Sequence, residues 1–193
     1  MTEPVYILPT GVANIASVRA ALERAGRDVF EIASRDEIEA APALVMPGVG
    51  TFGAAMQSLN EKCWIEPLRA RLLKGKKTLA ICVGLQVLCE SSEESPGAQG
   101  LGIIPKSVQR LNPASLPVPQ MGWNRVGNAY AYFANSYAIC GNAVKGWEVD
   151  CFHYGSDYIA ALRRGGVWAC QFHPELSGRY GQDIIQQWLE VAC

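Results

Sequence analysis

The 193-residue sequence lacks an excess of positive charge, a long apolar run and a pair of closely spaced cysteines. Its 17 lysines and arginines are balanced by 18 aspartates and glutamates, giving a net charge of -1. Without an excess of lysine and arginine the chain cannot neutralise the phosphates of a nucleic acid, so we do not expect nucleic acid to be the main ligand. No apolar stretch approaches the ~20 residues of a membrane span. The N-terminal residues lack the pattern of a signal peptide, so we expect a cytoplasmic protein.

Cysteine and histidine usage narrows the possible chemistry. The seven cysteines are Cys63, Cys82, Cys89, Cys140, Cys151, Cys170 and Cys193. Their scattered spacing argues against a disulfide framework and against a zinc ribbon, and we expect most of them to be buried in a reducing compartment. The chain has only two histidines, His153 and His173, so any histidine-dependent reaction must use one of them.

Short apolar runs alternate with amphipathic segments and predict an α/β fold. The predicted strands are residues 5–8, 28–32, 43–46, 78–81 and 167–172. The predicted helices are residues 15–25, 52–73 with a break near Pro67, and 180–192. Short apolar strands separated by helices are typical of a parallel sheet covered on both faces. Residues 96–119 are rich in glycine and proline, residues 123–137 predict antiparallel strands, and the length indicates one domain over residues 1–193.

The segment AICVGLQ, residues 80–86, carries the sharpest local signal. A buried strand ends at Cys82, and Gly84 begins a helical pattern, so the cysteine lies at a tight strand-to-helix turn. Such a turn exposes a nucleophile at the carboxyl end of the sheet, and a helix N-terminus behind it favours the thiolate. A plain buried cysteine at a strand end would produce the same local pattern.

The segment QFHPELSG, residues 171–178, supplies a candidate base. Residues two apart in an extended chain point to the same side, so Glu175 can hold one ring nitrogen of His173 and orient the other toward a nucleophile. A surface turn after a strand is the alternative. Because Cys82 and His173 both end predicted parallel strands, they should meet at one edge of the sheet, which favours a Cys-His-Glu triad.

The glycine-rich segment MPGVGTFG, residues 46–53, lies between a predicted strand and a predicted helix. Its backbone N–H groups could stabilise a developing oxyanion or bind a phosphate. It lacks the Lys-Ser/Thr of a nucleotide-binding loop and does not match the dinucleotide-binding pattern. By itself this segment leaves both possibilities open.

The ordered set PGVGTFG, AICVGLQ and QFHPE resembles the class I, triad-type glutamine amidotransferases. Three further segments, SSEESPGAQGLG, VPQMGWN and YFANSY, resemble the glutaminase subunits of imidazole glycerol phosphate synthase in histidine biosynthesis. The resemblance covers about residues 5–190. It implies an open, mostly parallel, flavodoxin-like sheet with helices on both faces and additional antiparallel strands.

The resemblance also implies residue roles. Cys82 would be the nucleophile, His173 the base and acid, and Glu175 the group that orients the histidine. The oxyanion strand would contain Gly48, Val49 and Gly50. The glutamine pocket would contain Gln86, Glu94, Tyr132, Asn135 and Ser136. The partner face would contain Asn14, Gln120, Trp123, Asn124 and Leu176. A free amino acid needs an acidic group for its ammonium, which Glu94 could supply; without the family, Glu94 would be read as a solvated loop charge.

The reaction implied by the family is hydrolysis of L-glutamine to L-glutamate and ammonia, with no metal or organic cofactor. In the family, ammonia passes to a (β/α)8 cyclase subunit in a heterodimer, which yields imidazole glycerol phosphate and an aminoimidazole carboxamide ribotide. Alternatives are a related amidotransferase that serves another acceptor, a non-catalytic binding subunit, and a different enzyme on a similar sheet, such as a cysteine peptidase.

The sequence departs from the family pattern at several positions outside the triad. Ala80 replaces the usual glycine of the turn before the nucleophile, and both Gln120 and Asn135 stand where histidine is common. Leu176 follows HPE where lysine is usual, and TGVAN replaces the usual glycine-rich N-terminal turn. Because several of these positions belong to the expected substrate and partner faces, the acceptor is less well defined by the sequence than the chemistry is.

Overall fold

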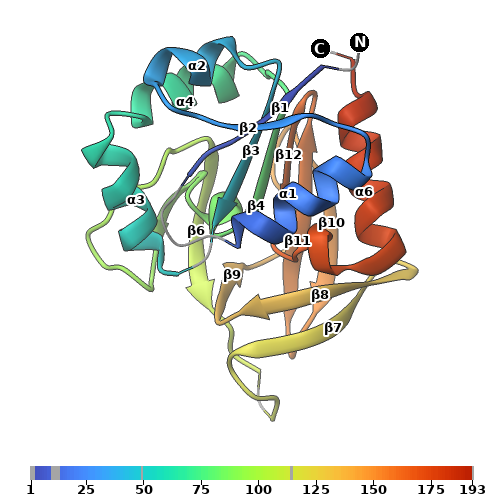
Figure 1. The fold of residues 1–193 in the computed structure, drawn as a ribbon. Helices are drawn as coiled ribbons and strands as arrows, with labels where there is room; N and C mark the ends of the chain where they lie inside the picture. The colour runs from blue at the N-terminus through green and yellow to red at the C-terminus, as the bar shows by residue number, and fades with distance from the viewer. Residues whose placement is uncertain (1–2, 10–13, 49, 114, 193) are drawn as a thin grey trace.

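The computed structural model describes residues 3–9, 14–48, 50–113 and 115–192. The parallel strands of the main sheet are β1 (Val5–Ile7), β2 (Val29–Glu31), β3 (Ala43–Gly48), β4 (Thr78–Cys82) and β12 (Val167–Cys170). Antiparallel pairing adds β11 (Asp157–Arg164) and β10 (Glu148–His153). Within the described residues the strand order is β10-β11-β12-β4-β3-β1-β2 (Figure 1), which confirms the predicted open, mostly parallel sheet.

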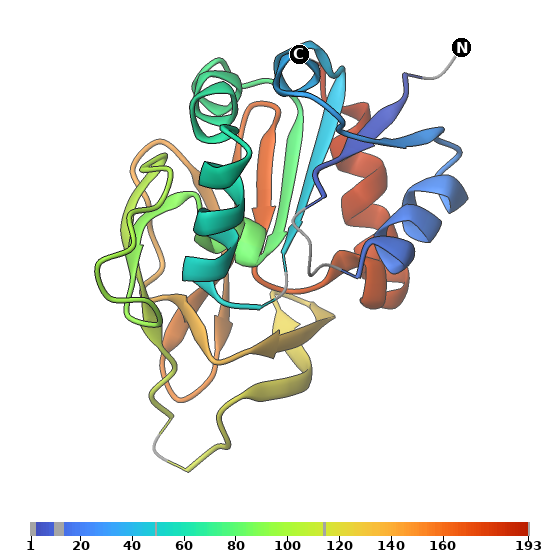
Figure 2. The ribbon, with the colours of Figure 1, turned by 60° about the vertical axis from the view of Figure 1, so that its left-hand side comes forward.

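Helices cover both faces of this sheet. One face carries α1 (Ile15–Arg24) and α6 (Gly178–Glu190), and the other carries α2 (Arg35–Ala40), α3 (Phe52–Glu61) and α4 (Ile65–Leu73), as Figures 1 and 2 show. The buried side chains of α6 recur at helical spacing, so one stripe of the helix packs on the sheet while the opposite stripe faces solvent. None of the described helices is long and apolar enough to cross a membrane.

Two proline positions differ from the sequence-based expectation. The helical stretch 52–73 is broken at residues 62–64 rather than near Pro67, and Cys63 at this break has a φ of 56°. Pro67 lies in the first turn of α4, where a missing N–H costs no intrahelical hydrogen bond. Strand β3 continues through Pro47, because β1 no longer pairs with β3 at this point.

Smaller elements lie around the carboxyl ends of the parallel strands. A hairpin of β7 (Gln120–Val126) and β8 (Ala129–Asn135) confirms the predicted antiparallel strands, and it lies across these ends (Figure 1). A second small sheet contains β5 (Cys89–Ser92), β6 (Ile104–Arg110) and β9 (Tyr137–Ile139). The short helices are α5 (Val83–Gln86) and the 3-10 turn η1 (Pro174–Leu176).

The buried centre of the sheet places the candidate triad at one edge. Every residue of β3 and β4 is buried, as expected for strands covered on both faces. Strand β4 ends at Cys82, and its parallel neighbour β12 ends three residues before His173. Because both strands run in the same direction, the fold brings these two residues to the same edge, as the sequence predicts.

Candidate active site

Cys82 lies at a strained turn between β4 and α5. Its φ of 55° and ψ of -112° are unfavourable for a residue with a side chain, and such strain is typical of nucleophiles at strand-to-helix turns. A Cβ atom on Gly84 would stand 2.0 Å from the Met46 carbonyl oxygen, so only glycine lets this turn approach β3 so closely. Helix α5 has only four residues, so the helix-terminus effect expected from the sequence is smaller than a long helix would provide.

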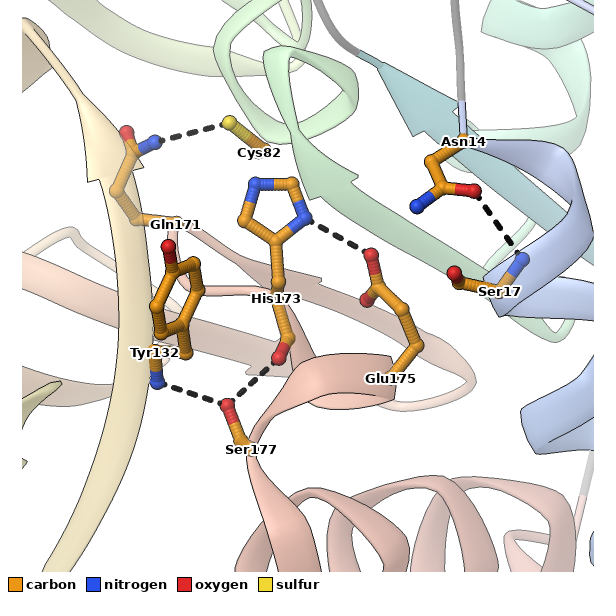
Figure 3. A network of polar contacts seen from close by, with 8 residues as sticks. All are labelled: Asn14, Ser17, Cys82, Tyr132, Gln171, His173, Glu175 and Ser177. Carbon is orange, nitrogen blue, oxygen red and sulfur yellow. Dashed lines mark hydrogen bonds and ion pairs between the residues drawn. The ribbon is translucent and has the colours of Figure 1, made fainter. Parts of the chain in front are cut away.

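His173 is buried beside Cys82 and is oriented by Glu175. Its Nδ1 atom is 2.9 Å from Oε1 of Glu175, and the other ring nitrogen faces Cys82 (Figure 3). The predicted pair is therefore present, but the predicted reason is wrong. Glu175 lies in the 3-10 turn η1 rather than in extended chain, so the tight turn and not strand alternation brings its carboxylate to the imidazole.

The surroundings of His173 favour its protonated form. Burial alone lowers the pKa of the imidazole, but hydrogen bonds to Cys82 and Glu175, together with their charges, outweigh this and raise the pKa from 6.5 to about 10. These contacts favour the imidazolium form of His173, which lies between a sulfur and a carboxylate. This state is suited to a histidine that must donate a proton to a leaving group.

Three hydrogen bonds attach the backbone of His173 to strand β8. The N–H of His173 donates to the carbonyl oxygen of Tyr132 at 2.9 Å. The hydroxyl of Ser177 donates to the carbonyl oxygen of His173 at 2.6 Å and accepts the N–H of Tyr132 at 2.9 Å (Figure 3). The position of His173 thus depends on the β7-β8 hairpin as well as on the main sheet.

A cavity of about 210 Å³ adjoins the triad. The residues that line it are Gly50, Cys82, Val83, Gln86, Glu94, Pro119, Ala134, Asn135, Ser136, Tyr137 and His173. Cavities for drug-sized ligands are larger, so this space suits a molecule of amino-acid size. A larger groove along residues 109–113 contains no triad residue and is more open, so we place the site at the smaller cavity.

Comparisons with known proteins agree with this geometry. A family model for the CobB/CobQ-like glutamine amidotransferase domain matches residues 12–164, which include Cys82 but not His173. The Escherichia coli (strain K12) imidazole glycerol phosphate synthase subunit HisH is 38% identical, with 97% of this chain and 99% of that protein covered. The chain belongs to the HisH family of glutamine amidotransferases.

Two further relatives extend the HisH comparison. The chloroplastic imidazole glycerol phosphate synthase hisHF of Arabidopsis thaliana is 38% identical over 96% of this chain. The chain spans only 34% of the length of that plant protein. A crystal structure described as a glutamine amidotransferase superposes with a TM-score of 0.74 at 22% identity, covering 96% of this chain and 97% of the other, and supports the fold.

Most of the residues that the HisH resemblance assigns to glutamine do line the cavity. They are Gly50, Gln86, Glu94, Asn135 and Ser136. Gly48 pairs with Cys82 across β3 and β4 and is buried, but it is not among the residues that line the cavity. Val49 lies outside the described residues. Tyr132 is not among the described residues that line the cavity; its backbone instead holds His173.

Glu94 has a structural contact that the sequence does not suggest. Its Oε2 accepts the backbone N–H of Phe52 at 2.7 Å, at the first residue of α3. The residue is therefore not a solvated loop charge, which was the alternative to a substrate role. Its carboxylate both holds the start of α3 and lines the cavity beside Cys82.

The residues assigned to the partner face divide into surface and buried groups. Trp123 and Leu176 are 57% and 41% exposed, and Asn14 is exposed while its Oδ1 accepts the N–H of Ser17 at the start of α1. Asn124 is half-buried and donates to the carbonyl oxygen of His153. Gln120 is only 3% exposed, so its assignment to a contact surface is wrong: in the β7-β8 register it pairs with buried Asn135.

Two residues near the triad are absent from the sequence-based assignment. Ser177 clamps His173 to β8, and the amide of Gln171 reaches the sulfur of Cys82 (Figure 3). Gln171 could have been found from the sequence, because it precedes His173 by two residues in the motif QFHPE. No group of three or more histidine, cysteine, aspartate or glutamate side chains within the described part of the chain is arranged to hold a metal ion.

The raised pKa of His173 yields a direct test of the triad geometry. In Cys82→Ala the largest of the influences that raise this pKa is lost while burial still lowers it, so the pKa should fall below about 10. The two histidines can be followed separately by NMR of ¹³C-labelled imidazole, with exposed His153 as an internal reference. The exposed variant Cys63→Ala should leave the His173 midpoint unchanged, and an unchanged midpoint in folded Cys82→Ala would contradict the geometry.

Proposed function

We propose that this chain hydrolyses L-glutamine to L-glutamate and ammonia, using Cys82, His173 and Glu175 as a triad. The observation that carries the proposal is the position of His173, which lies between Cys82 and the Glu175 carboxylate at the wall of a small cavity. Membership of the HisH family supports the same reaction. We further propose that residues 1–193 form one glutamine amidotransferase domain.

The thiolate of Cys82 attacks the side-chain carboxamide carbon of glutamine, and a tetrahedral intermediate forms. The imidazolium of His173 gives its proton to the amide nitrogen, and ammonia leaves as the C–N bond breaks. Water then attacks the glutamyl thioester while His173 accepts a proton from it; the C–S bond breaks, glutamate is released, and the thiolate–imidazolium pair is restored. Glu175 stays ionised throughout and holds the imidazole by its Nδ1–H.

The rest of the cavity supplies groups for the amino-acid end of the substrate. Glu94 offers a carboxylate for the α-ammonium group, and Asn135 and Ser136 offer polar groups beside it. The Oδ1 atom of Asn135 is buried and accepts no hydrogen bond within the described structure, while its Nδ2 donates to the carbonyl oxygen of Tyr137. An N–H of the substrate would satisfy this oxygen. The Gly48–Gly50 stretch stays our proposal for the oxyanion site.

We infer that the ammonia passes to a (β/α)8 cyclase subunit in a heterodimer, which makes the chain the glutaminase subunit of imidazole glycerol phosphate synthase in histidine biosynthesis. The names of the HisH and hisHF relatives support this inference. Exposed Trp123 and Leu176 are the proposed contact residues. A cytoplasmic location remains a prediction.

A related amidotransferase with another acceptor is the second candidate. It is favoured by Leu176, which is exposed beside the triad where the family usually has lysine. Leucine cannot pair with an acidic residue of a partner, so we expect a neutral or apolar partner group opposite it.

Substitution of the two histidines tests the proposed base. His173→Ala should lower glutamine hydrolysis at least ~100-fold, the usual scale for losing a general acid-base. His153→Ala is the matched control, because His153 is exposed and bonded to Asp157 rather than to the triad. Initial rates of glutamate release should be compared for both folded variants. A larger loss in His153→Ala would reject the assignment.

Partner dependence tests the proposed place in a two-subunit enzyme. Ammonia released into water is lost to the acceptor reaction, so we expect weak hydrolysis by the isolated chain and strong activation by the cyclase subunit with its nucleotide ligand. Glutaminase rates with and without both components measure this. Trp123→Ala should weaken the activation, because large exposed aromatic residues often anchor interfaces. Full activity of the isolated chain, unchanged by the partner, would contradict partner gating.

A further inference from the structure

Gln171 places a buried amide against the nucleophile. The residue has no solvent exposure, and its Nε2 atom is 3.7 Å from the Sγ atom of Cys82. Its Oε1 atom accepts a hydrogen bond from Nε2 of Gln86 at 3.1 Å. Figure 3 shows the amide directed at the sulfur from a different side than the imidazole of His173. The reaction sequence above assigns this residue no role.

A chain of amides that starts at a backbone carbonyl determines which atom of Gln171 faces the sulfur. The carbonyl oxygen of Tyr137 can only accept, so Gln86 must turn its Nε2 toward it, at 3.0 Å. The same NH2 group donates to Gln171, which must therefore present its oxygen to Gln86. The Nε2 of Gln171 is left to face Cys82. The contact is thus N–H to sulfur, and not carbonyl to sulfur.

We propose that Gln171 is a catalytic residue that donates an N–H to the thiolate of Cys82, and that Gln86 is a positioning residue that keeps Gln171 in this orientation. The inference deepens the proposed glutaminase function and rests on it. A thiolate accepts hydrogen bonds more strongly than a thiol, so the donor favours the reactive form. It also holds the sulfur in place while His173 moves its proton.

The amide complements the charged groups around the sulfur. The titratable side chains facing the same cavity are His173, Glu94 and Tyr137. The imidazolium of His173 stabilises the thiolate, but it loses its proton when ammonia departs. Gln171 has no titratable proton, so its donor persists through both halves of the reaction. The Gln171 amide therefore provides a second, neutral hydrogen-bond donor to the Cys82 sulfur when the sulfur leaves the acyl group.

Alkylation of Cys82 by iodoacetamide tests the proposal without glutamine or a partner. Gln171→Met removes the donor and keeps the length of the side chain. We expect Cys82 to react about tenfold more slowly at neutral pH, because a hydrogen bond to a charged group is typically worth that much. Peptide mass spectrometry follows each cysteine separately, and Cys82→Ala supplies the blank.

Other cysteines of the same chain act as controls. Exposed Cys63 should react at an unchanged rate in every variant. Buried Cys89 and Cys170 should stay unlabelled unless the fold is lost, since burial raises the pKa of both thiols. Gln109→Met, on the exposed surface of β6, is the matched substitution and should leave Cys82 unaffected.

Two outcomes decide the matter. A parent-like alkylation rate for Cys82 in folded Gln171→Met would overturn the proposal. Labelling of Cys89 in Gln171→Met would mean that this variant has lost its fold, and Gln86→Met then replaces it. Gln86→Met removes the hydrogen bond that orients the Gln171 amide and leaves the contact of Gln171 with the sulfur unaltered in sequence. Slower alkylation of Cys82 in Gln86→Met supports the proposal, and a parent-like rate overturns it. Iodoacetamide needs no substrate site, so a failure of the glutaminase assignment would be seen separately, as absent glutamate release.

Discussion

A positive charge on the buried imidazole of His173 requires partners on both sides, because a buried charge without partners is strongly unfavourable. Glu175 balances it at Nδ1, and Cys82 balances it at the other nitrogen. A different local backbone conformation brings each partner to the histidine. A tight 3-10 turn places the carboxylate, and a strained strand-to-helix turn places the sulfur. The contact between Cys82 and His173 requires both turns to lie side by side.

The topology of the sheet makes that meeting possible. Strands β4 and β12 are parallel neighbours at the buried centre, so their carboxyl ends open at one edge. The β7-β8 hairpin crosses this edge and is bonded to the backbone of His173 through Tyr132 and Ser177. The hairpin that carries exposed Trp123 is therefore the same element whose backbone is hydrogen-bonded to His173. A partner that displaces the hairpin would act directly on His173, the proposed catalytic histidine.

The sequence predicts the features that depend on local patterns. Continuous apolar strands and helical periodicity predicted the parallel sheet. The residues around Cys82 and His173 predicted that these two side chains and Glu175 lie together, whereas their roles in catalysis stay a proposal. Strands β10 and β11 and helix α2 were not predicted. Strand β10 has no unbroken apolar run, and α2 has only six residues and therefore no long helical period. Strand β11 does contain a buried apolar run at residues 158–162, which the sequence analysis did not assign. The break after α3 was misplaced at Pro67, since a proline in a first turn is compatible with a helix. The burial of Gln120 and the amide chain through Gln86 depend on tertiary pairing, which no local pattern encodes.

Covalent labelling by a glutamine-mimicking electrophile tests the central claim most directly. Such a reagent requires both a pocket for the amino acid and a nucleophile beside it. We expect one label per chain on Cys82, out of seven cysteines, with protection by L-glutamine and no labelling of Cys82→Ala. Labelling that persists undiminished in Cys82→Ala would contradict the assignment of the nucleophile.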